Sequence, residues 1–477
     1  MAVLVLLCSA QFVVVLDVTI VAVTLPTLQR ELGFAAPDLQ WVITSYTLCF
    51  AALLTVAGRA ADLWGRRRLF VAGLILFGAA SLGCAMAERA ELLVLMRALQ
   101  GCGAAALSAA ALALLTAAFP GGRERGRAVA AWTAAAAGGG ASGWVLGGVM
   151  TEQLGWESVF LVNVPIALVA LAAAPAVLRE SRDRSASQRL DLLGALLLAG
   201  ALAALVLGLT RAERGWSSAS ALGPLAAAAA LLLAFWRHER SARSPLLPPA
   251  DLRRPGFARA CAAGLLLTAT TSPAMFLAVL LQQNVLGYSP AQAGLGSAPF
   301  NVAVIAGSAA GPALARLAGA RRAMAGGLGG VALGACVLAA ADAGSGYPQL
   351  VLAFAVMGAS LGCASVASTA LGTKALAADR QGLAAGLLGT AAQIGTVLGL
   401  AAFIPFAAAR AGDTGDPATG YAWAQGGVAL AALAGAALLG LASRPWGYTR
   451  QGFAAGNGRK DSREAGPRRS AVRRGLR

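Results

Sequence analysis

Charged residues are scarce in this chain. Asp, Glu, Lys and Arg make up 12% of its 477 residues, whereas about 25% is usual in a soluble protein. Hydrophobic residues make up 58%, and they form continuous apolar runs of roughly bilayer length from one end of the chain to the other. Such runs exclude a membrane β-barrel, whose strands are short segments of alternating polarity. The composition therefore predicts an all-α protein that crosses the membrane many times.

Residues that build metal, disulfide and nucleotide sites are scarce as well. The chain has one histidine, His238, and its seven cysteines form no Cys-x-x-Cys pair, so neither a metal site nor a disulfide framework is indicated. A Gly-Lys-Ser/Thr phosphate-binding loop and a His-Glu-x-x-His pair are both missing, which argues against ATP-driven transport and against an enzyme. We expect no metal and no cofactor. If the protein does work, a proton gradient must supply the energy.

Fourteen apolar runs are long enough to be membrane spans. The first continues past signal-peptide length as far as Pro26, so we expect it to remain as an uncleaved span. The expected spans are 3–26, 39–58, 69–87, 91–117, 127–150, 157–178, 190–209, 219–236, 259–282, 292–315, 323–341, 349–372, 382–406 and 421–442.

The short basic turn from Gly58 to Arg68 separates two of these spans and sets the expected topology. If this turn is cytoplasmic, 32 of the 38 Lys and Arg residues fall on the cytoplasmic side, five fall on the opposite side, and Arg97 alone lies within a span. The distribution follows the positive-inside rule, and it places both termini in the cytoplasm. The net charge of +17 is then a topology signal, and we expect no nucleic-acid partner.

The longest charged connections divide the spans into groups. They predict a six-helix bundle over 1–178, a two-helix insert with flanking cytoplasmic loops over 179–258, and a second six-helix bundle over 259–442. The stretch 443–477 is polar, rich in Gly and Arg and without apolar periodicity. We expect it to be a disordered cytoplasmic tail close to anionic lipid.

Two ionisable residues lie inside expected spans, where a charge is costly and marks a functional candidate. Asp17 lies nine residues before Pro26, roughly 13 Å from that end of its span, and Arg97 lies roughly 10 Å from the same side. A buried carboxylate near a cation can be poised to gain and lose a proton. The alternative is a static pair, Asp17 with Arg97 or with Thr19, that only fixes helix packing.

Two neutral polar residues are candidates for a substrate cavity. Thr19 is two residues from Asp17, and Gln100 shares a helix face with Arg97. Gln100 either hydrogen-bonds a substrate or links two helices, and the sequence favours neither. The rest of the expected cavity is rich in Ala and Gly, which suits bulky and varied compounds.

Glycines mark two further features. The expected span 127–150 carries Gly139, Gly143, Gly147 and Gly148, and small residues four apart let two membrane helices approach closely. By itself this pattern indicates tight packing.

The turn between the second and third spans is the other glycine feature. Its residues Gly58, Asp62, Gly65, Arg66 and Arg67 follow a Gly-x-x-x-Asp-x-x-Gly spacing. The glycines permit a tight backbone, and the acid can cap a helix or pair with an arginine. Topology alone explains the arginines, but it does not explain this spacing.

Together these motifs resemble the major facilitator superfamily, and specifically its fourteen-helix drug/proton antiporters. L-D-V-T-I-V-A-V-T-L-P (16–26) is similar to that subfamily's first-helix motif, G-R-A-A-D-L-W-G-R-R-R (58–68) to the superfamily's loop signature, and R-A-L-Q-G-C-G-A-A (97–105) to its fourth-helix motif. The resemblance runs nearly from end to end of the chain. The loop signature identifies the superfamily and does not indicate a substrate.

The resemblance implies two pseudo-symmetric bundles that rock around a central cavity. It implies that Asp17 takes part in proton coupling with help from Arg97, and that Asp62 and its arginines form a cytoplasmic latch. One departure matters, because Gly143 is followed by Trp144 where the antiporter motif has a proline.

The expected function is therefore proton-coupled efflux of small amphipathic organic compounds, such as drugs or natural products, by alternating access in the cell membrane. We expect the protein to work as a monomer with the lipid bilayer and a small-molecule substrate as its partners. Two alternatives remain open: a proton-coupled uptake symporter built on the same fold, and a membrane sensor that transports nothing.

Overall fold

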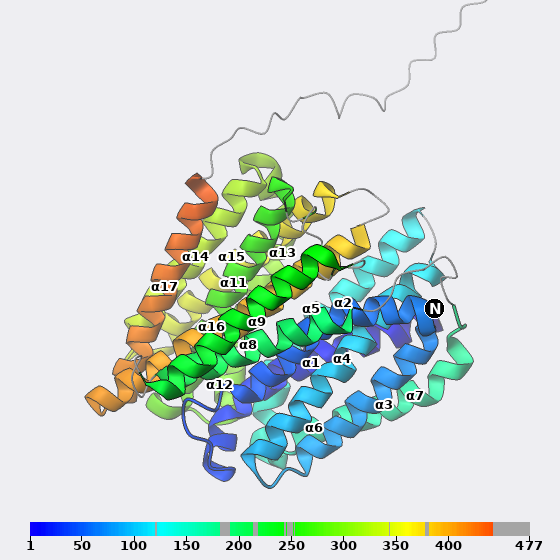
Figure 1. The fold of residues 1–477 in the computed structure, drawn as a ribbon. Helices are drawn as coiled ribbons and strands as arrows, with labels where there is room; N and C mark the ends of the chain where they lie inside the picture. The colour runs from blue at the N-terminus through cyan, green and yellow to red at the C-terminus, as the bar shows by residue number, and fades with distance from the viewer. Residues whose placement is uncertain are drawn as a thin grey trace, which may run out of the picture. The chain divides into compact units, whose positions relative to one another are not determined.

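In the computed structural model, all regular secondary structure of the described residues is helical (Figure 1). Met1–Leu441 form one compact unit. The predicted tail, 443–477, lies outside the described residues. Those residues are 1–119, 122–181, 191–212, 218–242, 245, 251, 253–342, 344–376 and 381–441.

Each of the first six expected spans coincides with a helix or with two consecutive helices, and we call this part the first half. Its helices are α1 (Ala2–Glu31), α2 (Trp41–Trp64), α3 (Arg66–Ala85), α4 (Ala90–Ala118), α5 (Gly122–Leu154), α6 (Ser158–Leu161) and α7 (Asn163–Val177).

The remaining eight expected spans also coincide with helices. Two of them are α8 (Leu192–Arg211) and α9 (Ala219–Ser241). The others form what we call the second half: α11 (Pro255–Leu280), the π-helical turn η2 (Leu281–Val285), α12 (Pro290–Gly296), α13 (Ala298–Ala318), α14 (Ala320–Ala339), α15 (Tyr347–Ala375), α16 (Gln381–Thr414) and α17 (Pro417–Leu441).

Thirteen of the fourteen segments are long and apolar enough to cross a membrane, counted over the described part of the chain. The segment outside that set is α5, which is 33 residues long. Its length suffices for a span, but its glycines lower the mean hydropathy. The same glycines that allow close packing thus weaken the hydropathy signal of this helix.

The helices pack in groups that follow the order of the chain. In the first half α1 lies along α5, and α4 lies along both α2 and α3; in the second half α11 lies along α16, and α15 along both α13 and α14. The helices α8 and α9 pack against each other (green in Figure 1), and α8 also contacts α2 and α16. The boundaries predicted at 178, 258 and 442 stay predictions.

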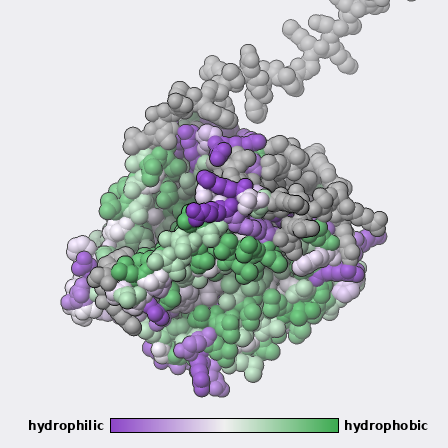
Figure 2. Space-filling view, viewed as in Figure 1, coloured by the Kyte–Doolittle hydropathy of each residue, from purple (hydrophilic) through white to green (hydrophobic). Residues whose placement is uncertain are grey.

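Apolar side chains cover much of the face seen in Figure 2, and hydrophilic ones gather in clusters toward its margins. Leu193 and Leu196 of α8 and Leu233 of α9 are among the exposed large hydrophobic residues. Exposed apolar surface on this scale is a liability in water, and it is what a lipid-facing surface requires.

The backbones of α1 and α5 meet at the predicted glycines. A methyl group on Gly139 would overlap the carbonyl oxygen of Phe12, and one on Gly147 would overlap that of Ile20. Gly143 lies equally close to the Thr19 hydroxyl. Three of the four predicted glycines therefore form a seam between α1 and α5, as the four-residue spacing predicts.

The fourth glycine, Gly148, faces a different helix. Its missing side chain makes room for the carbonyl oxygen of Pro290 and for Ala291 at the start of α12. The same two helices meet again where Gly294 lies against the Trp144 carbonyl oxygen. Gly148 thus brings the first half into contact with the second, at the end of the helices opposite the Gly58–Arg68 turn.

Candidate functional site

Asp17 lies on α1 with its side chain fully buried, and side chains from α4 and α7 surround it. Nη1 of Arg97 donates to one carboxylate oxygen at 2.5 Å. Nε2 of Gln100 and Nδ2 of Asn163 each donate to the other oxygen at 2.7 Å. All four side chains have an exposed fraction of 0%. The carboxylate therefore has both the cation and the hydrogen bonds that a buried charge requires.

The same contacts fix Arg97. Its Nε donates to the backbone oxygen of Val42 on α2 at 2.9 Å, and Nη1 also donates to the Gln100 side-chain oxygen at 2.6 Å. The guanidinium carbon lies 4.4 Å from the centre of the Tyr46 ring, a distance at which an aromatic face attracts a cation. We call Asp17, Arg97, Gln100 and Asn163 the polar cluster.

The structure brings Asp17 and Arg97 together, as their similar depth suggested. Of the two roles left open for Gln100, the structure shows the link between helices: both ends of its amide are bonded, and Nε2 also donates to Ser81 at 2.7 Å. Sequence reasoning missed Asn163. A signal was present, since Asn163 is the one polar residue between Val159 and Leu178.

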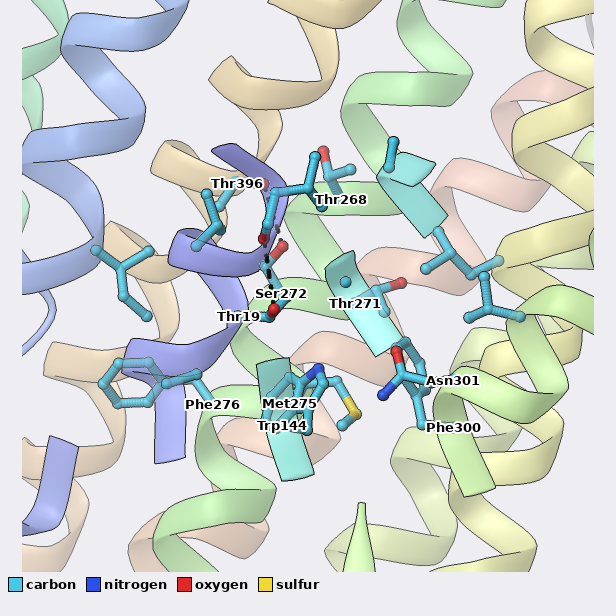
Figure 3. Close-up of a pocket in the computed structure, with 18 of the residues that line it drawn as sticks. Thr19, Trp144, Thr268, Thr271, Ser272, Met275, Phe276, Phe300, Asn301 and Thr396 are labelled. Atoms are coloured by element: carbon cyan, nitrogen blue, oxygen red, sulfur yellow. Dashed lines mark hydrogen bonds between the residues drawn. The ribbon is translucent and has the colours of Figure 1, made fainter. Parts of the chain in front are cut away.

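A cavity of about 320 Å³ lies between the two halves (Figure 3). Helices α1, α2 and α5 line it from the first half, and α11, α13, α15 and α16 line it from the second. Trp144, Met275, Phe276 and Phe300 supply large apolar surfaces at one end. Its size and lining fit a small organic molecule, because such sites are mostly apolar with few polar groups.

Helix α1 separates the cavity from the polar cluster. Thr19 lines the cavity, and its hydroxyl donates to the backbone oxygen of Leu16 at 3.1 Å; its contact with a substrate stays a prediction. Asp17, two residues earlier, faces α4 and α7 and is not part of the wall. The proton candidate and the cavity thus lie on opposite sides of one helix.

The Gly58–Arg68 turn is tied together within the first half. Gly65 has a positive φ of 114°, which permits the reversal between α2 and α3. Arg66 donates to Asp62 at 2.8 Å, and the side chain of Arg67 donates to the backbone oxygen of Leu178 at 3.3 Å. The space beside Gly58 is open, because a methyl group added there would have no neighbouring atom within 4 Å.

Glu180 completes this turn, and sequence reasoning missed it. Its carboxylate accepts the backbone N–H of Arg67 at 3.1 Å and lies 3.9 Å from the Arg68 side chain. An acid there satisfies a free N–H in the first turn of α3 and interacts favourably with the helix dipole. These contacts of Asp62 and Glu180 all lie within the first half, and the role of Asp62 and its arginines as a cytoplasmic latch stays a prediction.

A second acid, Glu152, lies where the two halves meet at the opposite end. Its carboxylate accepts the backbone N–H of Ala291, at the start of α12, at 3.0 Å. Hydrogen bonds from the Ser289 hydroxyl and from this N–H hold the pKa of the Glu152 carboxyl below its ordinary value. Nearby, Nε2 of Gln283 donates to the backbone oxygen of Val23 at 2.8 Å. Polar contacts therefore join α5 to α12 and η2 to α1.

No group of three or more His, Cys, Asp or Glu side chains placed to hold a metal ion occurs among the residues that the structure describes.

Comparison with known families bears directly on this architecture. Residues 7–400 match the Major Facilitator Superfamily. The chain belongs to this superfamily. Superfamily members are membrane transporters, and the helices described above are those of a multi-pass member.

Several curated relatives share the superfamily. The cephamycin export protein CmcT of Amycolatopsis lactamdurans is 46% identical over 305 residues, which cover 63% of this chain and 63% of the relative. The puromycin resistance protein pur8 of Streptomyces alboniger is 41% identical, over 64% of this chain and 60% of the relative. The matched region thus spans about 60% of the length of these relatives.

Solved structures agree on the fold. The crystal structure of the peptide transporter POT in complex with sulfate superposes with a TM-score of 0.67 over 92% of this chain and 94% of that one, at 16% identity. The structure of the POT family transporter PepTSo gives 0.66 at 14% identity. The major facilitator fold of the chain is therefore shared with transporters that differ widely from it in sequence.

Proposed function

We propose that this protein is a proton-coupled exporter of small organic compounds that works by alternating access in the cell membrane, with both termini in the cytoplasm. The observation that carries the proposal is the buried Asp17 carboxylate, which lies one helix away from a cavity between the two halves. The names of the relatives, an export protein and a resistance protein, support export as the direction of transport. Protons are the proposed coupling ion, and no other cofactor is proposed.

The polar cluster provides the proton step. In the described arrangement the Asp17 carboxylate accepts hydrogen bonds from Arg97, Gln100 and Asn163. A proton arriving on the oxygen that Arg97 holds would compete with the guanidinium for that oxygen, while the two amides continue to hold the other. Gain and loss of a proton then change how α4 is held to α1. One proton moving down a potential of 100 mV supplies about 2.3 kcal/mol.

Alternating access requires the contacts between the halves to open at one end at a time. At the end away from the Gly58–Arg68 turn, α5 lies against α12 and η2 against α1. We propose that this end faces the outside, so that release of a compound needs these contacts to part. The α1–α5 seam connects the helix that carries Asp17 to the helix that carries Trp144 and Glu152. A change at Asp17 would thereby be transmitted through α5 to its contacts with α12.

The test uses Asp17→Asn, which removes the titratable group and keeps its size. Everted membrane vesicles and the susceptibility of an efflux-deficient host to a panel of antibiotics measure transport with and without the variant. We expect gradient-driven efflux and resistance to fall to the level of the empty host when the amounts of membrane-inserted variant and unmodified protein are matched. Asp413→Asn is the matched control, because Asp413 is exposed and its ion-pair partner among the described residues is Arg410, at 3.6 Å.

Three outcomes would contradict the proposal. Full resistance in Asp17→Asn would remove the proton role from this residue. Accumulation in intact cells, and not in everted vesicles, would make the protein an uptake symporter. Equal susceptibility of the host with and without the unmodified protein, across the whole panel and with no compound moved, would favour a sensor.

A further inference from the structure

We propose that the cavity selects uncharged compounds that carry a hydrogen-bond acceptor, and that Thr271 and Asn301 recognise this acceptor. The inference rests on the proposed function in one respect, since it takes the cavity to be where the exported compound binds. It assigns the choice of compound to α11 and α13 of the second half, and it separates that choice from the acid on α1.

The cavity wall is uncharged over its described residues. Among the described residues that line the cavity, none is Asp, Glu, Lys, Arg or His. A charged compound would have to leave water for a largely apolar space without an opposite charge beside it, which is unfavourable. Asp17 cannot serve as that partner, because the body of α1 lies between its carboxylate and the cavity and its oxygens are already bonded.

Most polar side chains on the cavity wall already have a hydrogen-bond partner within the protein. Four are already satisfied by the protein. Thr19 and Thr268 donate to backbone oxygens, and the hydroxyls of Ser272 and Thr396 lie 3.1 Å from each other. These hydroxyl groups gain little from a ligand, because they already have hydrogen-bond partners within the protein.

Thr271 and Asn301 are the exceptions. The Thr271 side chain is 4% exposed, and its hydroxyl has no hydrogen-bond partner among the described residues. The amide nitrogen of Asn301 is buried and likewise unpartnered. Both line the cavity, and Figure 3 shows them on the same side of it. Because buried donors left unpaired are costly, a compound whose acceptor meets these two groups removes that cost.

Aromatic rings line the apolar end of the cavity. Trp144, Phe276 and Phe300 offer ring surfaces that accommodate an apolar body, and aromatic faces also attract cations. The unpartnered atom of Asn301 is its amide nitrogen, which presents the positive end of an N–H bond, and no described acid on the wall offsets a positive charge. This nitrogen lies beside Phe300 on α13, where Figure 3 shows it directed toward Met275 and Trp144. The donor therefore favours a neutral acceptor over a positive charge.

The test compares three probes of similar shape on the purified full-length protein in detergent. Triphenylphosphine oxide is neutral with a strong acceptor, triphenylmethane is neutral with none, and methyltriphenylphosphonium is a cation with none. We expect the oxide to bind at least about tenfold more tightly than either of the others in equilibrium binding with radiolabelled probes. Equal or tighter binding of the phosphonium would overturn the proposal.

Two substitutions locate the recognition. Asn301→Asp replaces the donor with a carboxylate of the same shape, and it should weaken the oxide about tenfold while strengthening the phosphonium. Thr271→Val removes only the hydroxyl, and it should weaken the oxide severalfold without changing triphenylmethane. Thr373→Val is the control, because Thr373 lies outside the cavity wall and its hydroxyl donates to its own helix.

An equal loss of all three probes in both variants would mean that these residues only shape the cavity, and it would overturn the proposal. If Asn301→Asp does not give monodisperse protein, the Thr271→Val comparison decides alone. The binding measurement uses no proton gradient. Its outcome is therefore independent of whether Asp17→Asn stops transport, and the two proposals can fail separately.

Discussion

In the first half α1 packs on α5, and in the second half α11 packs on α16, through glycines placed in the same way. Gly139 lies against the carbonyl oxygen of Phe12, and Gly395 lies against that of Leu265. The turns between helices repeat as well. Gly65 joins α2 to α3 with a φ of 114°, and Gly319 joins α13 to α14 with a φ of 84°.

At matching backbone positions the two halves carry different side chains, one charged and one neutral. Asp17 lies five residues after Phe12, and the residue five after Leu265 is Thr270. The Thr270 hydroxyl donates to its own helix at Leu266, 2.8 Å away.

Helix α4 packs on α2 in the first half as α15 packs on α13 in the second. Gly101 meets the Tyr46 carbonyl oxygen as Gly358 meets that of Phe300. Counting back four residues from each glycine pairs Arg97 with Phe354.

The two halves therefore share a scaffold and divide the chemistry. The buried Asp17–Arg97 ion pair lies in the first half, and the matching positions in the second half hold Thr270 and Phe354. The polar residues on the cavity wall are distributed the opposite way: one, Thr19, comes from the first half, and Thr268, Thr271, Ser272, Asn301 and Thr396 come from the second. The lesson is that repeated backbone packing does not require repeated function.

The largest difference in stability cost between matched substitutions in the two halves should come from Arg97→Met. The substitution leaves the Asp17 carboxylate buried without its cation, which costs about 3–5 kcal/mol of stability when one member of a buried pair is removed. Phe354→Met, the matched change in the second half, should cost less than about 1.5 kcal/mol. Thermal unfolding of the purified proteins measures both. The double variant Asp17→Asn, Arg97→Met should recover most of the loss, and a double variant as unstable as Arg97→Met would contradict this account.

The shared scaffold predicts equal effects of one methyl group in the two halves. Gly139→Ala and Gly395→Ala each press a methyl group onto a carbonyl oxygen of the neighbouring helix, and each should cost about 1–3 kcal/mol. Gly140→Ala is the control, since its methyl group would lie 3.5 Å from Val15, an ordinary contact. Unfolding measurements in which only one of the two seams responds would show that the halves are not packed alike.

The contact of Glu152 with α12 should depend on pH. Because the pKa of Glu152 is lowered in the folded protein, the contact is intact above the ordinary carboxyl pKa and is lost as the pH falls through the lowered value. Glu152→Ala should raise amide hydrogen exchange at Ala291 severalfold at neutral pH. The ratio to the unmodified protein should approach one in acid. An exchange-rate ratio of one at every pH would show that Glu152 does not hold the Ala291 N–H.

The smallest effect is expected from Thr270→Val. The hydroxyl donates to backbone oxygens of its own helix, so its loss should cost about 1 kcal/mol or less and leave gradient-driven efflux unchanged. The vesicle assay used for Asp17→Asn provides the measurement. Loss of coupling in this variant would mean that the second half takes part in the proton step after all.

The helices were predictable from the sequence, because a bilayer-length apolar segment has few structures available other than a helix. Asp17 and Arg97 were identifiable for a related reason, since a charge inside such a segment is rare. Gln100 was not assignable in this way. Whether its amide faces a cavity or another helix depends on the rotation and packing of α4, and neither is readable from one sequence.

Other contributors carry no distinctive local pattern. Glu180 lies in the charged stretch that follows α7, and nothing around it indicates that it meets Arg67 more than a hundred residues earlier. Trp144 was visible as a departure from the expected proline, but its place on the cavity wall follows from how α5 is held between α1 and α12. Long-range packing of this kind lies beyond local sequence reasoning.

The π-helical turn η2 has a mechanical consequence. Its backbone N–H of Leu286 reaches the oxygen of Leu281, so the turn stores one residue more than an α-helical turn would. One residue corresponds to about 100° of helix rotation. Returning η2 to α-helical geometry would therefore turn Gln283 away from the Val23 oxygen that it now reaches. A change in the register of five residues would break this one hydrogen bond between the halves.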